Sequence, residues 1–255
     1  MNLTDLPMNP PLMAWMFQIV VPLTCLAMAI YHLNRTRRTG SLSLAALLFL
    51  GGMTMWWQEW YADWGAYIMQ NPHFALMPWG STTWTTPYKP WGVIPGYGIY
   101  FGAAYWLLVE MIERLRKAKP DLGPWAATTL VVAPMFYLWD LGIETGVTSM
   151  GWLTYTFSFG PAITNAHGSF PLVWPITLFA ASSVLMVRLF IAKGADGLWP
   201  HERILGIGGM AQGFKRELAR FCAWAVTMNL MFWFFLTFPL ILVRIYFGPA
   251  STLVP

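Results

Sequence analysis

Hydrophobic residues in this chain gather in six long stretches, and the segments between these stretches hold most of the charges. A helix that crosses a bilayer needs about 20 mostly apolar residues, and each stretch is close to that length. The pattern therefore predicts an all-α fold, a polytopic membrane bundle of about six transmembrane helices. The expected spans are about 12–33, 42–64, 94–112, 125–146, 170–191 and 218–243.

Composition supports a membrane location. Of the 255 residues, 57% are hydrophobic and 10% are charged, whereas soluble domains carry about 25% charged residues. No internal repeat or low-complexity tract divides the chain, so we expect one integral membrane domain over residues 1–255 in the cell membrane. The first apolar stretch is long enough to span and follows no basic segment, so we expect a span there rather than a cleaved signal.

The positive charges predict an orientation. Thirteen of the fifteen Lys and Arg residues follow the first, third and fifth stretches, and only Lys89 and Arg244 lie elsewhere. Short cytoplasmic loops are basic, so this asymmetry places both termini outside. The net charge of +4 then reflects membrane orientation, and we exclude nucleic acid as a partner.

The two outer loops, residues 65–93 and 147–169, are rich in aromatic and small residues and nearly free of charge. Single Trp and Tyr side chains at this level are typical of the membrane interface. The loops are nevertheless long and too apolar to be solvated tails. We therefore expect them to fold back over the outer mouth of the bundle as a lid.

Two pairs of acidic residues stand at the outer ends of the second and fourth spans. Glu59 and Asp63 form one pair, and Asp140 and Glu144 form the other. The spacing of four residues puts both members of a pair on one helix face. Acids in membrane spans are costly, so they indicate function, although solvation at headgroup level is the alternative. With Lys89 as the one outer-loop cation, the four cannot all be ionised, and we predict general acid and general base roles for them.

Polar and aromatic residues on the same side are candidates for substrate binding. Aromatic rings can line an apolar pocket and stabilise a cationic intermediate, while packing or an interfacial position is the alternative. The candidates are Trp57, Trp60, Tyr61, Trp64, Trp139, Tyr155, His73, His167 and Asn165. The four acids with His73 and His167 could also hold two metal ions, but the usual Glu-x-x-His pairs are missing. We therefore expect no metal and no other cofactor.

Several features in sequence order resemble a known family. After the acidic helix end and the aromatic loop comes Pro-Gly-Tyr-Gly at 95–98, followed by the Asp140–Glu144 pair. A loop with Tyr, Phe and Gly-Pro follows, and then Gly-Ser-Phe-Pro-Leu at 168–172. Over residues 45–190 the chain resembles the AveC-like spirocyclase family of actinobacterial integral membrane proteins. A weaker resemblance, through a Trp-Glu pair in an early helix, is to small membrane-bound terpene cyclases.

The resemblance implies formation of a spiroketal from a dihydroxyketone polyketide, sometimes with dehydration. One departure concerns the second span, where the family has Asp-Pro followed by an Asn-Tyr-like element. This chain has Gln-Glu-Trp-Tyr-Ala-Asp at 58–63. The resemblance therefore leaves the substrate open.

Together, these features predict an acid–base enzyme of the bilayer that cyclises a lipophilic polyketide or isoprenoid-like small molecule. Glu59 or Asp140 would protonate a carbonyl, epoxide or alkene, and another carboxylate would accept a proton. The alternatives are a metal-dependent membrane oxidoreductase or hydrolase, a proton- or cation-coupled transport or binding protein, and a non-catalytic docking subunit. The transporter alternative lacks a repeated half or paired broken helices in the sequence.

Overall fold

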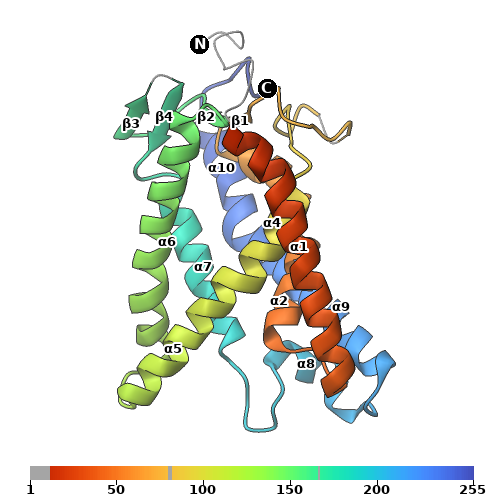
Figure 1. The fold of residues 1–255 in the computed structure, drawn as a ribbon. Helices are drawn as coiled ribbons and strands as arrows, with labels where there is room; N and C mark the ends of the chain where they lie inside the picture. The colour runs from red at the N-terminus through yellow and green to blue at the C-terminus, as the bar shows by residue number, and fades with distance from the viewer. Residues whose placement is uncertain (1–11, 80–81, 166) are drawn as a thin grey trace.

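The computed structural model describes residues 12–79, 82–165 and 167–255, which form a mostly helical bundle with a small sheet at one end (Figure 1). The helices are α1 (Leu12–Thr39), α2 (Leu44–Met53), α3 (Gln58–Gly65), α4 (Val93–Ile99), the π-helical segment η2 (Tyr100–Tyr105), α5 (Trp106–Ala118), α6 (Pro124–Ser149), α7 (Ile176–Phe190), α8 (Pro200–Ile204), the 3-10 turn η3 (Ile207–Gly209), α9 (Phe214–Phe232), the π-helical segment η4 (Trp233–Thr237) and α10 (Phe238–Phe247). The N-terminal tail, residues 1–11, whose outer location the charge pattern predicts, lies outside the described residues.

Three helices of the described chain are long and apolar enough to cross a membrane. They are residues 17–39 in α1, all of α6, and the continuous run 214–247 that joins α9, η4 and α10. The other three expected spans correspond to shorter pieces, with α2 and α7 as apolar helices of 10 and 15 residues. Length and composition thus give three candidate spans.

The expected span 42–64 is broken at residues 54–57, between α2 and α3. Backbone groups freed at a helix end need new partners. Here the Thr54 hydroxyl donates to the Gly51 carbonyl over 2.6 Å. Asn229 of α9 donates to the Thr54 hydroxyl, while Gln58 donates to the Asn229 side chain and backbone at 3.0 Å. Polar contacts with α9 therefore stabilise the break between α2 and α3, which the hydrophobic pattern of the sequence does not reveal.

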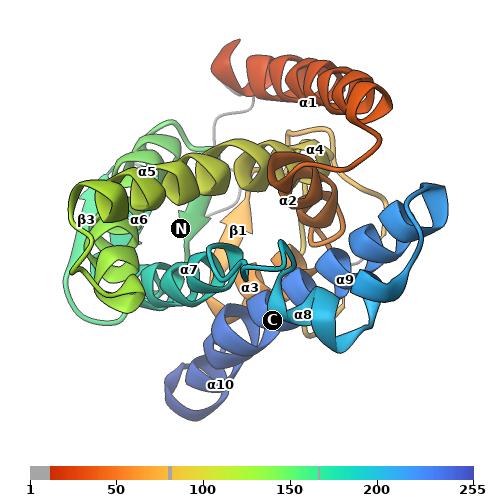
Figure 2. The same ribbon diagram turned by 90° about the horizontal axis from the view of Figure 1, so that it is seen from below.

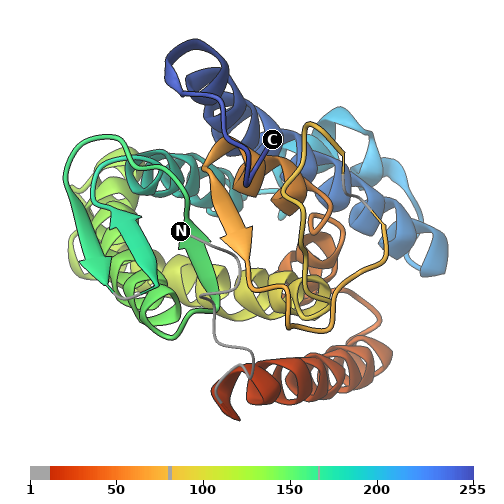
Figure 3. The ribbon, with the colours of Figure 1, turned by 90° about the horizontal axis from the view of Figure 1, so that it is seen from above.

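A four-stranded antiparallel sheet covers one end of the bundle (Figure 3). Its strands are β1 (Ile68–Gln70), β2 (Leu153–Tyr155), β3 (Ala162–Asn165) and β4 (Gly168–Pro171), in the order β1-β2-β4-β3. The strands come from the two nearly uncharged loops, except that β4 extends beyond the end of the second loop. The prediction of an all-α chain missed this sheet. Buried backbone groups must be paired, and these two loops satisfy that need by pairing with each other. β4 also includes residues 170 and 171, the first two of the expected span 170–191. Helix α7 therefore begins only at Ile176.

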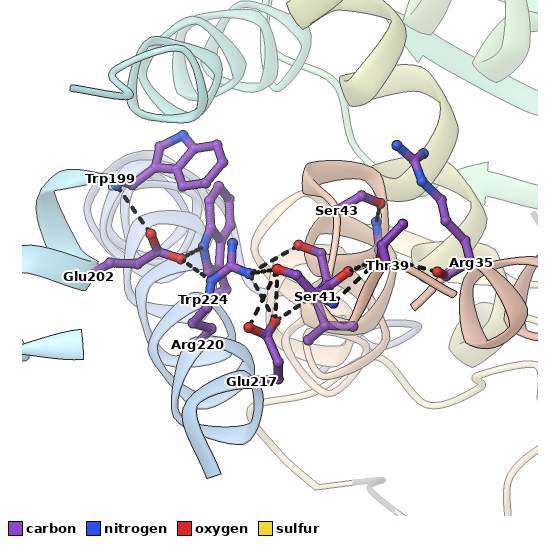
Figure 4. A network of polar contacts seen from close by, with 11 residues as sticks. Arg35, Thr39, Ser41, Ser43, Trp199, Glu202, Glu217, Arg220 and Trp224 are labelled. Carbon is purple, nitrogen blue, oxygen red and sulfur yellow. Dashed lines mark hydrogen bonds and ion pairs between the residues drawn. The ribbon is translucent and has the colours of Figure 1, made fainter. Parts of the chain in front are cut away.

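The opposite end of the bundle holds α8, the start of α9 and the loops that connect them (Figure 2). A buried polar network closes this end (Figure 4). The Arg220 guanidinium of α9 donates to Glu202 at 2.9 Å, to Glu217 at 2.8 Å and to the Ser41 hydroxyl at 2.9 Å. The Leu42 amide donates to Glu217 at 2.7 Å. The network ties the turn after α1 to α8 and α9.

The hydrophobic core lies between these two ends. Helices α2, α6, α7 and α9, together with η2, supply its fully buried side chains, including Phe101, Tyr105 and Trp224. Helix α1 lies at the edge of the bundle against α4 (Figure 2). Its apolar side chains Leu23 and Leu26 are exposed. Such an uncovered apolar helix face is compatible with a lipid environment.

Candidate active site

A cavity of about 360 Å³ lies at the sheet end of the bundle. Residues of α3, α4, η2, α6, α7, η4, α10 and the strands β1 and β2 border it. All four carboxylates singled out from the sequence line this one space. They are Glu59 and Asp63 on α3 and Asp140 and Glu144 on α6. The two pairs, about eighty residues apart in the chain, therefore converge.

Lys89 brings a positive charge to the α3 pair. Its side chain is 1% exposed, with Nζ 3.5 Å from Glu59 Oε1 and paired with Asp63 Oδ2. The segment that carries Lys89 is fixed by its backbone, because the Met77 amide donates to the Lys89 carbonyl at 2.9 Å. The Thr86 hydroxyl also donates to the Ile68 carbonyl at 2.7 Å. The loop thus places a buried ammonium against α3.

Neutral donors complete the surroundings of the α3 pair. Gln70 Nε2 donates to Asp63 Oδ2 at 3.0 Å, and the Tyr97 hydroxyl donates to Glu59 Oε2. Gln70 reaches Asp63 because the chain reverses at Tyr67, a non-glycine residue with a φ of +60°, as it passes from α3 into β1. Such left-handed backbone is uncommon and is often found near functional sites. Asp63 is 4% exposed.

The α6 pair has fewer partners. The Tyr155 hydroxyl donates to Glu144 Oε2 at 3.2 Å. Burial first, and then the nearby Glu144, raise the pKa of Tyr155 well above its usual range, so that Tyr155 remains a donor. Within the described chain, Asp140 has no hydrogen-bond or ion-pair partner, and neither acid of this pair contacts a Lys or Arg. Asp140 is thus free to bond to a ligand.

Tyr100 adds a second group without a partner. Its hydroxyl is buried, has no hydrogen bond among the described residues, and belongs to a side chain that lines the cavity. The remaining wall is largely apolar, with Phe101, Phe179 and Leu236 among its residues. A cavity with an apolar wall and a few converging polar groups is typical of a small-molecule site. Its carboxyl and phenol groups can donate or accept protons from a bound molecule.

Of the predicted aromatic ligands, Trp139 and Tyr155 line the cavity. The others lie on the remaining faces of α3. Trp57 stacks on Trp233 at 5.6 Å between centroids, and Tyr61 packs against the same ring at 5.7 Å. Helical periodicity explains the split, since residues 59, 62, 63 and 66 share one face of the helix. Trp57 and Tyr61 therefore pack α3 against η4.

The two other tryptophans of α3 are also engaged in packing. Trp60 is 4% exposed and lies edge-on to Trp56, with centroids 5.1 Å apart. Trp64 stacks under the Arg244 guanidinium, 3.9 Å from its ring centroid, and Arg244 donates to the Trp64 carbonyl. Neither ring borders the cavity.

The predicted histidines and Asn165 lie away from the cavity. His73 is exposed, and its amide donates to the Asn71 side chain at 2.9 Å. His167 repeats this arrangement with Asn165, also at 2.9 Å. Both are turn motifs that side-chain amides commonly stabilise. Throughout residues 12–79, 82–165 and 167–255, no three His, Cys, Asp or Glu side chains gather in a group suited to a metal ion.

Several residues of the cavity are not recognisable as site residues in the sequence. Tyr97 lies in the Pro-Gly-Tyr-Gly run that contributed to the family resemblance, yet it was not considered as an acid partner. Tyr100, Gln70 and Phe179 carried no sequence signal, because a single tyrosine, glutamine or phenylalanine in an apolar segment resembles ordinary packing. Lys89 was noted only as a nearby cation, and its burial against α3 depends on tertiary structure.

Comparisons with protein-family models, with curated proteins and with solved structures found no match.

Proposed function

We propose that this protein is a membrane-embedded acid–base enzyme that catalyses an intramolecular cyclisation of a lipophilic polyketide or isoprenoid-like substrate. The proposal rests mainly on one observation, the convergence of four carboxylates from two separate helices in one apolar cavity. The resemblance to the AveC-like spirocyclases suggests spiroketal formation as the specific reaction. The weaker resemblance to membrane terpene cyclases suggests the isoprenoid variant.

The proposal includes a multi-pass topology of six passes with both termini outside. The three short pieces would then cross together with their neighbours, α2 with α3, α4 with η2 and α5, and α7 with the segment before it. Supporting this, basic segments such as the end of α1 and the end of α5 lie at the end opposite the sheet (Figure 1). The sheet would be the outer lid, since Ile68 and Tyr155 of its strands border the cavity.

In the proposed reaction, a carboxyl group donates a proton to the substrate carbonyl oxygen while a substrate hydroxyl attacks the carbonyl carbon. Asp140 is the proton donor, since its carboxyl lacks a partner among the described residues. Glu59, held by Tyr97 and Lys89, accepts the proton that the hydroxyl releases. The new C–O bond closes a ring as a hemiketal, with no net gain or loss of protons by substrate and enzyme together.

A spiroketal requires a second ring closure. The hemiketal hydroxyl takes a proton from a carboxyl group and leaves as water, which creates an oxocarbenium ion. A second hydroxyl attacks this cation and gives its proton to a carboxylate, so the enzyme returns to its starting state. The rings of Trp139 and Tyr100 line the cavity and would stabilise the cation by about 0.5–2 kcal/mol.

The test uses Glu59→Gln and Asp140→Asn in protein reconstituted in lipid nanodiscs and supplied with long-chain dihydroxyketones. Because general acid–base catalysis contributes about 10²–10⁴-fold, each variant should lose roughly that factor in turnover. Asp140→Asn should keep its melting temperature, whereas Glu59→Gln weakens the bonds from Lys89 and Tyr97 and is assayed at a temperature where it is folded. Asp121→Asn is the matched control, since this exposed acid lies in the turn between α5 and α6. Unchanged turnover in both site variants would refute the acid–base assignment.

A further inference from the structure

A second, smaller cavity of about 70 Å³ lies between α5 and α6, next to the acid cavity. Two residues, Tyr100 and Trp139, line both spaces. The remaining wall is entirely aliphatic, aromatic or thioether in character. It consists of Ala104, Leu107, Leu108, Met111, Met135 and Phe136. We call this space the α5–α6 groove.

The α5–α6 groove opens on the outside of the bundle. Leu107 is 52% exposed, Met111 37% and Met135 42%, while Leu108 and Phe136 are buried behind them. These exposed side chains belong to α6, one of the candidate membrane spans, and to its neighbour α5. The groove thus lies between a hydrophobic outer surface and the Tyr100 and Trp139 side chains that also border the acid cavity.

The π-helical segment η2 contributes wall residues to both spaces. A π-helix is rare and is frequently found at functional sites, because the extra residue in the turn changes the direction of side chains. Here η2 carries both Tyr100 and Ala104, which line the groove. The Tyr100 hydroxyl is buried without a hydrogen-bond partner in the described structure. The Tyr100 side chain thus carries a polar group on the wall shared by the apolar groove and the acid cavity.

We propose that the α5–α6 groove binds the hydrocarbon chain of the substrate whose polar head reacts among the four carboxylates. The substrate class is then an amphiphile with an unbranched alkyl or alkenyl chain and a head that carries hydroxyl or carbonyl groups. The Tyr100 hydroxyl donates to the first oxygen of that head. This inference rests on the proposed function, because it assumes that the acid cavity holds the reacting head.

The dimensions of the groove favour a single chain over other occupants. At about 70 Å³, against 360 Å³ for the acid cavity, it has no room for a partner helix or a fused ring system. An unrelated membrane lipid would fill the groove without placing any group in the acid cavity. The shared wall formed by Tyr100 and Trp139 instead favours one molecule that occupies both spaces, and its chain would enter directly from the bilayer.

The test uses a linear fatty alcohol that carries a diazirine at the end of its chain, in phosphatidylcholine nanodiscs. Photolabelling followed by peptide mass spectrometry should place the label on residues 104–111 and 135–139. Ala104→Leu fills the groove and should reduce this labelling roughly tenfold, the effect of about 1.4 kcal/mol of overpacking. Ala103→Leu is the matched control, because Ala103 lies on the same segment, is exposed and does not line the groove.

A second probe, a diazirine alkane of the same length without the hydroxyl, separates substrate binding from plain lipid binding. It should label the same peptides several-fold less. Equal labelling by both probes, or equal labelling of the two alanine variants, would overturn the inference. Turnover of Glu59→Gln and Asp140→Asn tests the chemistry separately. Groove labelling with unchanged turnover would refute the acid–base function and leave the chain-binding groove standing.

Discussion

Two buried clusters at opposite ends of the bundle have the same charge pattern, one cation with two carboxylates. At one end Arg220 contacts Glu202 and Glu217, and at the other Lys89 contacts Glu59 and Asp63. The Arg220 cluster is closed, because the Leu42 and Trp199 amides, the Ser41 hydroxyl and the Trp224 indole supply further donors to its carboxylates (Figure 4). Its residues border neither the acid cavity nor the α5–α6 groove. The Lys89 cluster borders an open space that also holds two further acids.

This difference shows that burial and charge alone do not identify a functional site. A buried ion pair with every donor and acceptor satisfied stabilises one packing arrangement, whereas a buried carboxyl beside a cavity and without a partner is available to a ligand. The contrast predicts different responses to substitution at the two ends. The substitutions below run from the largest expected effect to the smallest, and a pH effect follows them.

Arg220→Met should have the largest effect, a destabilisation of about 3–5 kcal/mol. The substitution leaves Glu202 and Glu217 buried without their cation, and breaking a buried pair from one side is strongly destabilising. Thermal unfolding in detergent measures the effect. The matched control is Arg203→Met, which breaks the exposed pair with Asp196 and should cost about 0–1 kcal/mol. Similar melting temperatures for the two variants would contradict the view that the Arg220 cluster holds this end together.

Neutral substitutions of one acid at each end of the bundle should separate stability from activity. Glu217→Gln weakens charge-assisted bonds from Arg220 and the Leu42 amide and should cost about 1.5–3 kcal/mol. Asp140→Asn removes no hydrogen bond or ion pair within the described part of the chain and should change stability by less than about 0.5 kcal/mol. Denaturant or thermal unfolding of both variants measures these two changes in stability. A larger loss for Asp140→Asn would assign that residue a structural role.

Filling the acid cavity should impair binding without unfolding the protein. Gly96 of α4 lines the cavity, and a Cβ built there meets no other atom within 4 Å. Gly96→Leu should therefore fold normally and lower turnover or ligand affinity roughly tenfold, by excluding part of the substrate. Gly142→Leu on α6 is the control, since Gly142 is equally open but lies outside the cavity wall. Equal activity of the two variants would argue against a substrate in this space.

A pH effect is expected at the Arg220 end. His201 packs edge-on against Trp224 at 4.7 Å, and both of its nitrogens are buried without a partner among the described residues. Burial lowers the pKa of His201 to about 4, although the neighbouring Glu202 opposes the shift. The unfolded chain, with a pKa of about 6.5, takes up the proton first as the pH falls. Burial of the neutral His201 ring therefore contributes its full stabilisation above a pH of about 6.5. This contribution decreases as the pH falls below that value and is lost as the pH passes through about 4.

The measurement for His201 is the melting temperature from pH 7 to pH 4. Wild type should lose more of its melting temperature across this window than His201→Phe, which has no proton to gain. Parallel curves for the two proteins would show that this histidine does not contribute.

The candidate acids could be predicted from sequence because the signal is local. Glu59 and Asp63 share a helix face through their spacing alone, and so do Asp140 and Glu144. Carboxylates in apolar segments are rare enough to be noticed individually. The aromatic candidates were weaker indicators of a site than the acids. A tryptophan is equally suited to core packing, to the membrane interface or to ligand binding. In the structure Trp139 and Tyr155 line the cavity, while Trp57, Trp60, Tyr61 and Trp64 pack α3 against its neighbours.

The sheet could not be predicted, because its strands are three or four residues long and pair across large sequence separations. Ile68 pairs with Tyr155, for example, and only the fold brings these two loops together. The breaks within the apolar stretches were hidden for a similar reason. Thr54 and Gln58 end and begin helices by using Asn229, a residue more than 170 positions away.

By itself, then, the sequence determined the helical character, the long apolar segments and the two acid pairs, because each follows from composition or from periodicity within one segment. Only the tertiary structure decided that the pairs face one cavity, that Lys89 lies against the first pair and that Asp140 has no polar partner in the segments the structure describes. These features depend on how α3 and α6 pack with α4 and α7, and on a loop that folds back over α3. No local pattern encodes such long-range packing, since it is the sum of many weak contacts between distant segments.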